Sequence, residues 1–429
     1  MAYTAAAGEF ASRPIAPPGV MAFQRALIWL VGASGAIVFI EPSPYELVTL
    51  ASAAVFIATG IRLRAVFLPL LLLLFLVNLG YTISAVPLLD DSKIASWIAT
   101  SWYMAFTALF IAMVTSEDSA ARLDMLRRGL VLGGAMAGLA GVAGYFHLVP
   151  GGYDLLTLYG RARGTFKDPN VLGAFLILPA LLALQNVVTA RLAATLRASF
   201  ALGIMALAIL LAFSRAAWGG LVLTAAFMLV LMVLTSQTRG ERSRIIVMTL
   251  AAAAAGIVLI GVLLSIDSIA DMFKQRASFD QSYDEGRFGR FGRHILGADM
   301  ALDLPFGIGP LQFHNYFPED THNSYLNAFM SGGWLSGICY PALVFTTVIL
   351  GFRYLLVRVP WQRTYIAVFS AFLGTVGESF IIDTDHWRHF FLMLGTMWGM
   401  IAATRAHQAE ASRSIEIGSP SSAALSSPP

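Results

Sequence analysis

The chain has 429 residues, of which 57% are hydrophobic and only 12% are charged. Soluble domains carry about twice that charged fraction, and apolar runs of about 20 residues recur along the chain, so an ordinary soluble domain is excluded. The net charge of +3 comes mainly from Lys and Arg in the loops and does not indicate a nucleic-acid partner. The one cysteine, Cys339, excludes an intramolecular disulfide.

The apolar runs predict an all-α integral membrane protein, because they lack the alternation of barrel strands. We expect a membrane domain over residues 22–409, flanked by segments 1–21 and 410–429, which are cytoplasmic and disordered. The first segment has no basic region before an apolar one, which argues against a cleaved signal peptide. About twelve spans are predicted, near residues 22–40, 46–61, 65–82, 94–114, 129–148, 170–189, 198–213, 216–235, 246–266, 323–350, 364–381 and 389–404.

The positive-inside rule gives the orientation of these spans. With both termini in the cytoplasm, every inside loop carries arginine, and these segments together hold most of the 28 Lys and Arg residues. The long outer loops are then residues 149–169 and 267–322, and we expect short helices in the second. Positive charge retained on this disfavoured face indicates an anionic ligand there.

The first outer loop ends in the sequence YGRARGTFKDPNVLG, which contains Arg161, Arg163 and Lys167. Asp168 is expected as the N-cap of the next helix, with proline at its first position. Guanidinium groups and the free N–H groups of a helix N-terminus both suit phosphate. The sequence therefore predicts an anion site at the outer surface, with pairing to lipid headgroups as the alternative.

The second basic position is Arg215, in AFSRAAWGGL, where a very tight turn joins two apolar helices. A charge at the membrane edge costs on the order of 2.5–3.5 kcal/mol on insertion scales. It therefore needs an anionic partner or water, unless the side chain snorkels to the headgroups.

The long outer loop turns at Gly307 and Gly309 and ends at His322, directly before a new span. A neutral imidazole held near the membrane surface can take a proton from a hydroxyl, and Glu319 or Asp320 is placed to orient it. The alternative is a structural role, which most lone histidines have.

Other polar segments favour structural interpretations. GRFGRFGR resembles a phosphate loop but follows no predicted strand, so we interpret it as an amphipathic turn on the membrane surface. Asn323 and Ser324 are expected to cap the following helix. The charges of the last outer loop, including Asp383 and Asp385, are expected to pair with one another, and the histidine spacings do not fit a metal site.

Taken together, RARGTFKDPNVLG, FSRAAWGG, and PFGIGPLQF followed by THNSYLNAFMSGGWLSG resemble the O-antigen ligase and Wzy-type polysaccharide polymerase family. The resemblance covers about residues 159–350. It implies a metal-independent, inverting membrane glycosyltransferase without a cofactor, acting at the periplasmic face of the bacterial inner membrane. The donor would be a glycan on undecaprenyl diphosphate, and the acceptor another glycan or lipid A core. The implied partners are these substrates, membrane lipids and other polysaccharide-assembly proteins.

The resemblance also implies roles for individual residues. The first family arginine falls on Arg161 or Arg163, with Lys167 close by, and the second falls on Arg215; these bind the diphosphate and stabilise it as it leaves. The family histidine falls on His322, which would activate the acceptor hydroxyl. Beyond these family roles, we hypothesise that Arg287, Arg290 and Arg293 of the long loop also contact the substrate.

A twelve-span transporter or flippase of lipid-linked glycan is the alternative function. Transporters usually place ionisable groups near the middle of the membrane, whereas here Glu378, the likeliest carboxylate within a span, lies close to a span end. This placement favours an interfacial enzyme. Between ligase and polymerase we lean to a polymerase of O-antigen or exopolysaccharide, because the long loop is compact and the chain carries no added soluble domain.

Overall fold

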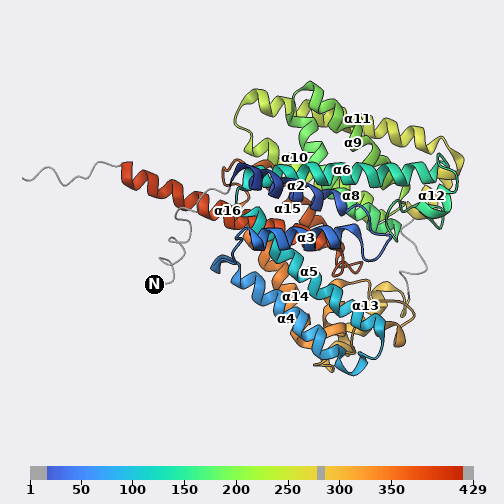
Figure 1. The fold of residues 1–429 in the computed structure, drawn as a ribbon. Helices are drawn as coiled ribbons and strands as arrows, with labels where there is room; N and C mark the ends of the chain where they lie inside the picture. Colours follow the sequence, from blue (N-terminus) through green and yellow to red (C-terminus); the bar gives the residue numbers. More distant parts are fainter. Residues whose placement is uncertain (1–16, 278–285, 419–429) are drawn as a thin grey trace, which may run out of the picture.

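The computed structural model describes residues 17–277 and 286–418, which form a bundle of helices (Figure 1). The helices are α2 (Pro18–Ser34), α3 (Pro44–Ala58), α4 (Leu68–Ala85), α5 (Ser92–Thr115), α6 (Ser119–Tyr145), α7 (Gly152–Leu156), α8 (Pro169–Thr189), α9 (Leu192–Leu211), α10 (Arg215–Thr235), α11 (Arg239–Leu264), α12 (Asp267–Ala277), α13 (Arg290–Leu302), α14 (Ser324–Tyr354), α15 (Gln362–Glu378) and α16 (Arg388–Gly418). Short 3-10 turns are η1 (Ala65–Phe67), η2 (Val86–Leu88) and η3 (Phe313–Asn315), and β1 (Thr157–Leu158) pairs with β2 (Arg161–Ala162).

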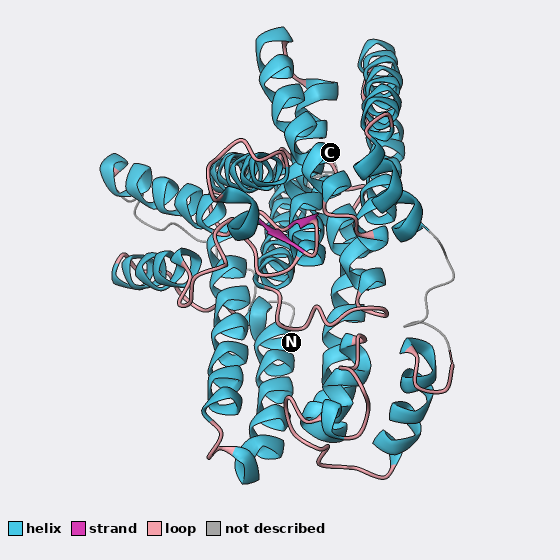
Figure 2. Ribbon diagram, turned by 90° about the vertical axis from the view of Figure 1, so that its right-hand side faces the viewer, coloured by secondary structure: helices cyan, strands magenta, loops and turns pink. Residues whose placement is uncertain are grey.

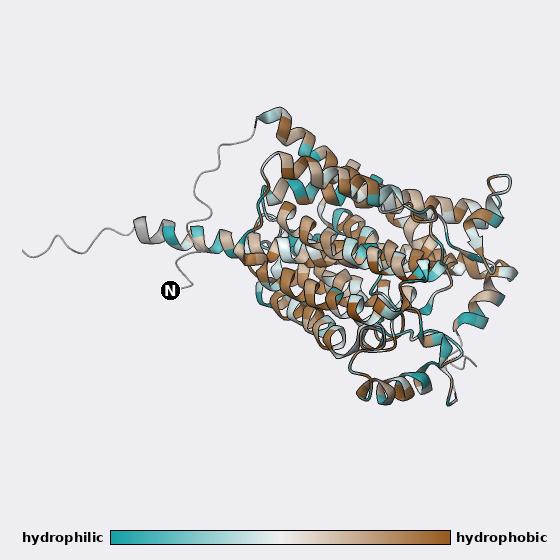
Figure 3. Ribbon diagram, turned by 60° about the horizontal axis from the view of Figure 1, so that its bottom comes forward, coloured by the Kyte–Doolittle hydropathy of each residue, from teal (hydrophilic) through white to brown (hydrophobic). Residues whose placement is uncertain are grey.

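Each of the twelve predicted spans corresponds to a helix. Eight helices in the described part of the chain are long and apolar enough to cross a membrane: α4 with its flanking turns, α5, α6, α8, α9, α10, α11 and α14. Figure 3 shows apolar residues along the bundled helices, with polar residues in the loops between them. The integral membrane class is therefore confirmed, while the remaining four spans, at α2, α3, α15 and α16, stay predictions.

The predicted terminal segments fall largely outside the described residues. Helix α2 begins at Pro18 and so includes the last residues of segment 1–21. Helix α16 extends to Gly418 and so includes the first residues of segment 410–429.

Helices that are distant in sequence approach closely at small residues. Between α4 and α14, a Cβ added to Gly80 would lie 2.3 Å from Ser336 Oγ, which itself donates a hydrogen bond to Val77 O at 2.7 Å. Between α5 and α16, a Cβ added to Gly395 would lie 2.3 Å from Ala108 O. Without a hydrophobic driving force between helices in lipid, such close backbone packing holds a membrane bundle together.

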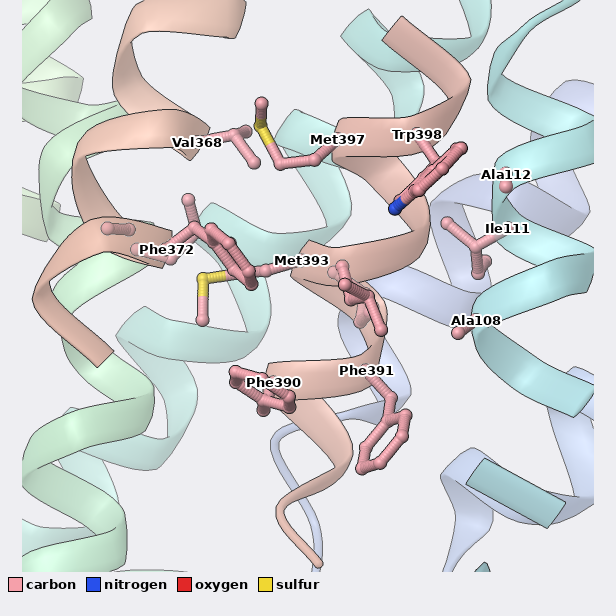
Figure 4. Packing of buried hydrophobic residues seen from close by; sticks show 14 of the residues in the cluster. Ala108, Ile111, Ala112, Val368, Phe372, Phe390, Phe391, Met393, Met397 and Trp398 are labelled. Atoms are coloured by element: carbon pink, nitrogen blue, oxygen red, sulfur yellow. The ribbon is translucent and has the colours of Figure 1, made fainter. Parts of the chain in front are cut away.

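The centre of the bundle is the first half of α16, which lies between α5 and α15 (Figure 4). Phe390 stacks on Phe372 of α15, with ring centroids 5.6 Å apart. Trp398 is buried beside Ile111 of α5 and donates a hydrogen bond from Nε1 to Thr347 Oγ1 at 2.9 Å. This packing fixes the α15–α16 pair and, with it, the loop that joins them.

Helix α14 is broken at Gly333, which has φ 63° and ψ −161°. The long outer loop fills the break: Trp334 N–H donates to Pro305 O at 3.0 Å, and Ile308 N–H donates to Met330 O at 2.7 Å. Non-helical backbone at membrane depth is tolerated where protein groups satisfy it. The apolar run over residues 323–350 predicted one unbroken span and gave no indication of this break.

The loop turns at the predicted glycines. Gly307 has φ +72° and Gly309 has φ +94°, both in the left-handed region. Gly307 also lies against α14, because an added Cβ would be 2.6 Å from Met330 O. The predicted bend is confirmed, and it brings the loop into contact with α14.

The β1–β2 hairpin was not predicted (Figure 2). Thr157 pairs with Ala162 and Leu158 with Arg161, joined by a two-residue turn in which Tyr159 and Gly160 both have positive φ. Two central residues with φ > 0 form the turn whose twist matches a hairpin. Its sequence signal is weak because tyrosine occupies a position where asparagine or glycine is usual.

Candidate active site

A cavity of about 650 Å³ lies where the starts of α8, α10 and α14 meet the end of α15. It is at the end of the bundle that carries α12 and α13, away from the N-terminus and the projecting end of α16 (Figure 1). Its charged and titratable lining residues are Arg161, Arg215, Arg276, Arg290, Glu319, Glu378 and His322. The fold thus brings together residues from four segments of the chain, and cations predominate.

Arg161 is fixed in the cavity wall. The hairpin places it on β2, where it is 7% exposed. Its Nε donates to Ala212 O at 2.8 Å, and its second terminal nitrogen donates to Asn170 Oδ1 at 2.7 Å. Asp168 caps α8 by accepting from Asn170 N–H at 2.7 Å, as the sequence predicted. Arg161 is therefore held between the end of α9 and the capped start of α8.

Arg163 and Lys167, the other two cations of this loop, point elsewhere. Arg163 donates to Leu155 O at 3.2 Å, and Lys167 forms an ion pair with Glu41. Leu156 O accepts from the N–H groups of both Arg163 and the next residue, so the regular alternation of side chains along β2 ends there. The side chain of Arg163 therefore does not lie on the same face of the hairpin as that of Arg161. Of the two positions that the sequence left open, the cavity contains Arg161.

Arg215 lies at the first position of α10 and is half-buried in the cavity wall. Phe213, with φ +46°, makes the predicted tight turn, and Ser214 caps the helix by accepting from Ala217 N–H at 3.5 Å. The start of α10 lines the cavity, so the positive end of its dipole adds to the charge of Arg215.

The backbone at His322 is held by a carboxylate from another loop. Asp383 accepts three hydrogen bonds: from Thr321 Oγ1 at 2.8 Å, from His322 N–H at 3.0 Å and from Asn323 N–H at 2.9 Å. His294 Nε2 donates to Thr321 O at 2.9 Å and holds the same turn from α13. His322 itself has φ +47°, a conformation that a residue other than glycine keeps only when its surroundings impose it.

The hydrogen bonds of Asp383 show that one prediction from the sequence was wrong. Asp383 was expected to pair within its own short loop, but it bonds to residues about sixty positions earlier. Asn323, by contrast, caps α14 as predicted, accepting from the N–H groups of Tyr325 and Leu326. The missed contact had no local signal because it depends on how α14 and α15 lie side by side.

The imidazole of His322 lines the cavity with 36% of its side chain exposed. Its Nε2 lies 4.0 Å from Glu319 Oε2, which also accepts from Arg293 at 2.8 Å. Burial, together with the Arg290 cation, lowers the pKa of His322 below its usual 6.5, although Glu319 opposes this. The lowered pKa favours the neutral imidazole, which is the form able to accept a proton.

Of the three loop arginines predicted to contact a ligand, Arg290 lines the cavity. Arg293 is 2% exposed and has a structural position, since it bonds Glu319 and the carbonyl of Phe288. Arg287 lies over the Phe288 ring, 5.7 Å from its centroid. The predicted contacts of Arg287 and Arg293 with a cavity ligand are not supported by these positions.

The lining residues that were not assigned to the site from the sequence include Asn170, Arg276 and Glu378. Asn170 belongs to the motif that was singled out, and Arg276 is one of the basic residues of the long loop. Glu378 is a carboxylate at the end of an apolar run, which is itself a signal. Within the described residues, no group of three or more His, Cys, Asp and Glu side chains could hold a metal ion, whereas the arginines suit an anion.

Comparison with known proteins gives one family. Residues 200–340 match the sequence model of the family described as O-antigen ligase. The resemblance to the O-antigen ligase and Wzy-type family is confirmed. No curated protein matches the chain. The O-antigen ligase match contains Arg215, Arg290 and His322, and the fold adds Arg161 and Asp383 to them from outside the matched segment.

Replacing Asp383 with asparagine is expected to lower the melting temperature of the purified protein. One of the three donors would face an amide N–H₂ group, and a buried donor left without an acceptor costs about 1–3 kcal/mol. The matched control is Asp90→Asn, since Asp90 is exposed in the turn before α5. Equal melting temperatures for the two variants in thermal unfolding would contradict the bonding described here.

Proposed function

We propose that this protein is a membrane glycosyltransferase of the O-antigen ligase and polymerase type. It transfers or polymerises glycan from undecaprenyl diphosphate at the periplasmic face of the bacterial inner membrane, in the synthesis of O-antigen or exopolysaccharide. The observation that carries this proposal is that His322 faces the same cavity as Arg161 and Arg215. The membrane-spanning helices and the O-antigen ligase match support the class of enzyme.

The arginines provide the site for the diphosphate. Arg161 and Arg215 lie in the cavity wall, and Arg276 and Arg290 line it from α12 and α13. Guanidinium groups bind phosphate oxygens in pairs, and the start of α10 adds the positive end of its helix dipole. As the bond between the anomeric carbon and the diphosphate oxygen breaks, the negative charge that stays on the lipid diphosphate is stabilised by these cations in place of a metal.

His322 provides the base. The acceptor hydroxyl gives its proton to the imidazole while its oxygen forms the new bond to the anomeric carbon, from the face opposite the diphosphate. The imidazolium so formed lies beside Glu319, whose carboxylate stabilises it at 4.0 Å from Nε2. Asp383 fixes the backbone of His322 and so acts as a positioning residue.

The apolar part of the cavity suits the rest of the donor. Phe213 and Phe291 line it next to the charged groups. A polyprenyl chain entering from the lipid would lie against such side chains, with its diphosphate held at the helix ends. Periplasmic placement follows from the positive-inside rule applied to the loops on the opposite side.

The alternative is a transporter of lipid-linked glycan. Against it, the charged groups that share this cavity lie at helix ends on one side of the bundle, which suits chemistry at an interface. A strain lacking the gene distinguishes the possibilities by its glycans. Donor trapped on the cytoplasmic side would indicate a transporter. Single repeats on lipid A core would indicate lost polymerisation, and core without repeats, with lipid-linked glycan accumulating, would indicate lost ligation.

Replacing His322 with alanine is expected to lower turnover about 10²- to 10⁴-fold, the usual contribution of a general base. The measurement is glycan transfer by the purified protein in liposomes. EDTA is expected to leave the wild-type rate unchanged, because arginines take the place of a metal. Near-wild-type turnover by His322→Ala, or loss of turnover in EDTA, would refute the mechanism.

Arg161→Lys is expected to lower kcat/KM about 10- to 100-fold, because a lysine cannot keep both bonds to the cavity wall and still present a planar fork to phosphate. Arg163→Lys, two positions along in the same loop, is the matched control and should stay close to wild type. The opposite ranking of the two variants in the transfer assay would show that the cavity arginine has been wrongly assigned.

The pH profile of kcat reports on His322. Because the neutral form is the base and its pKa is lowered, turnover should fall only as the pH drops below that pKa. Arg290→Gln removes a cation that lowers the pKa and should move this acid limb to higher pH. Glu319→Gln removes an anion that raises the pKa and should move it to lower pH. Shifts in the same direction for both variants would exclude His322 as the titrating base.

A further inference from the structure

Glu378 is the last residue of α15 and lines the cavity with His322. Its backbone carbonyl accepts from the N–H groups of Ile381 at 2.9 Å and Ile382 at 3.1 Å, which closes the helix end. The backbone of Glu378 thus has a structural use, while its carboxylate stands in the wall of the proposed active site.

One oxygen of that carboxyl group is buried without a partner in the described part of the chain. Glu378 is 8% exposed, and its Oε1 has no hydrogen-bond partner among the residues that the structure describes. Other glutamates at this end of the bundle pair with arginines: Glu319 with Arg293 and Glu46 with Arg388. A buried polar group without a partner is costly and calls for an explanation, and for a group in the wall of a cavity a bound ligand provides one.

The chemistry of the cavity limits what this ligand group can be. The cavity already provides arginines for a diphosphate, so the carboxyl group of Glu378 remains for another part of the substrate. A sugar next to the diphosphate presents neighbouring hydroxyl groups, and a carboxyl group can bond two of them with its two oxygens. Ile381 and Ile382, which line the cavity close to Glu378 in the chain, offer apolar surface to the C–H face of a sugar ring.

We propose that Glu378 binds hydroxyl groups of the sugar next to the reacting carbon and so positions that sugar for transfer. This inference rests on the proposed function and deepens it: arginines bind the diphosphate, and Glu378 recognises the glycan. The reacting anomeric carbon belongs to the donor sugar and forms its new bond to an oxygen of the acceptor sugar. The sugar that Glu378 binds is therefore either the donor sugar or the acceptor sugar. Both present the same hydroxyl chemistry, and kinetics separates them.

The test uses the full-length protein in detergent and two probes: undecaprenyl diphosphate without sugar, and lipid-linked glycan extracted from cells that lack the gene. Binding is followed as the rise in melting temperature, and transfer is followed in liposomes with donor and acceptor varied in turn. The variants are Glu378→Ala and Glu378→Gln. Glu241→Gln is the control, since Glu241 pairs with Arg363 at the opposite end of α15.

We expect Glu378→Ala to lower kcat/KM for one of the two sugar substrates about 10- to 100-fold, with Glu378→Gln retaining part of the activity. Binding of undecaprenyl diphosphate should be unchanged. Weaker binding of the lipid-linked glycan identifies the donor sugar, whereas a raised KM for the acceptor alone identifies the acceptor sugar. Both results support the inference.

Stability distinguishes this role from a structural one. Removing a buried carboxylate that has no partner should keep or raise the melting temperature of the free protein, as happens where function requires a destabilising group. Wild-type kcat/KM for both substrates in Glu378→Ala overturns the inference, and so does a loss of activity that accompanies a lower melting temperature. If the wild-type protein neither binds undecaprenyl diphosphate nor transfers glycan, the proposed function itself fails.

Discussion

The site depends on one carboxylate that accepts three hydrogen bonds from a turn on another helix. Asp383 lies in the loop between α15 and α16. It accepts hydrogen bonds from Thr321, His322 and Asn323 at the start of α14. These bonds, together with the one from His294 to Thr321 O, compensate the positive φ of His322. The aromatic packing of α16 between α5 and α15 fixes the loop from which this carboxylate comes, so the centre of the bundle is connected to the imidazole through a short series of contacts.

The cations at this end of the molecule divide into two groups. Arg293 and Lys167 have acidic partners within the fold, and Arg163 bonds to backbone carbonyls, so these side chains hold loops together. Arg161 and Arg215 lie in the wall of the cavity, where a ligand can reach them. In the sequence the two groups look alike, and only the fold shows which of these residues line the cavity.

The sequence was informative wherever the signal was local. Apolar runs located the helices, Asp168 and Asn323 were recognised as caps, and the glycine turn at Gly307 was predicted because only the chain nearby decides such features. It could not choose between Arg161 and Arg163, since that choice depends on where a two-residue strand ends.

The larger misses were contacts between distant segments. The partner of Asp383 lies about sixty residues away, and the break in α14 is stabilised by a loop that precedes the helix. Glu378 could be noted as a rare carboxylate in an apolar run, but its lack of a partner is visible only once the neighbouring helices are in place.

The break at Gly333 has a mechanical consequence. Because backbone bonds of 3.0 Å and 2.7 Å join the preceding loop to α14, this part of the loop cannot separate from the helix without leaving polar backbone groups unpaired. The stretch from Pro305 to Ile308 is therefore an anchor for the long outer loop, whose cavity residues Arg276 and Arg290 come earlier in the chain, from α12 and α13.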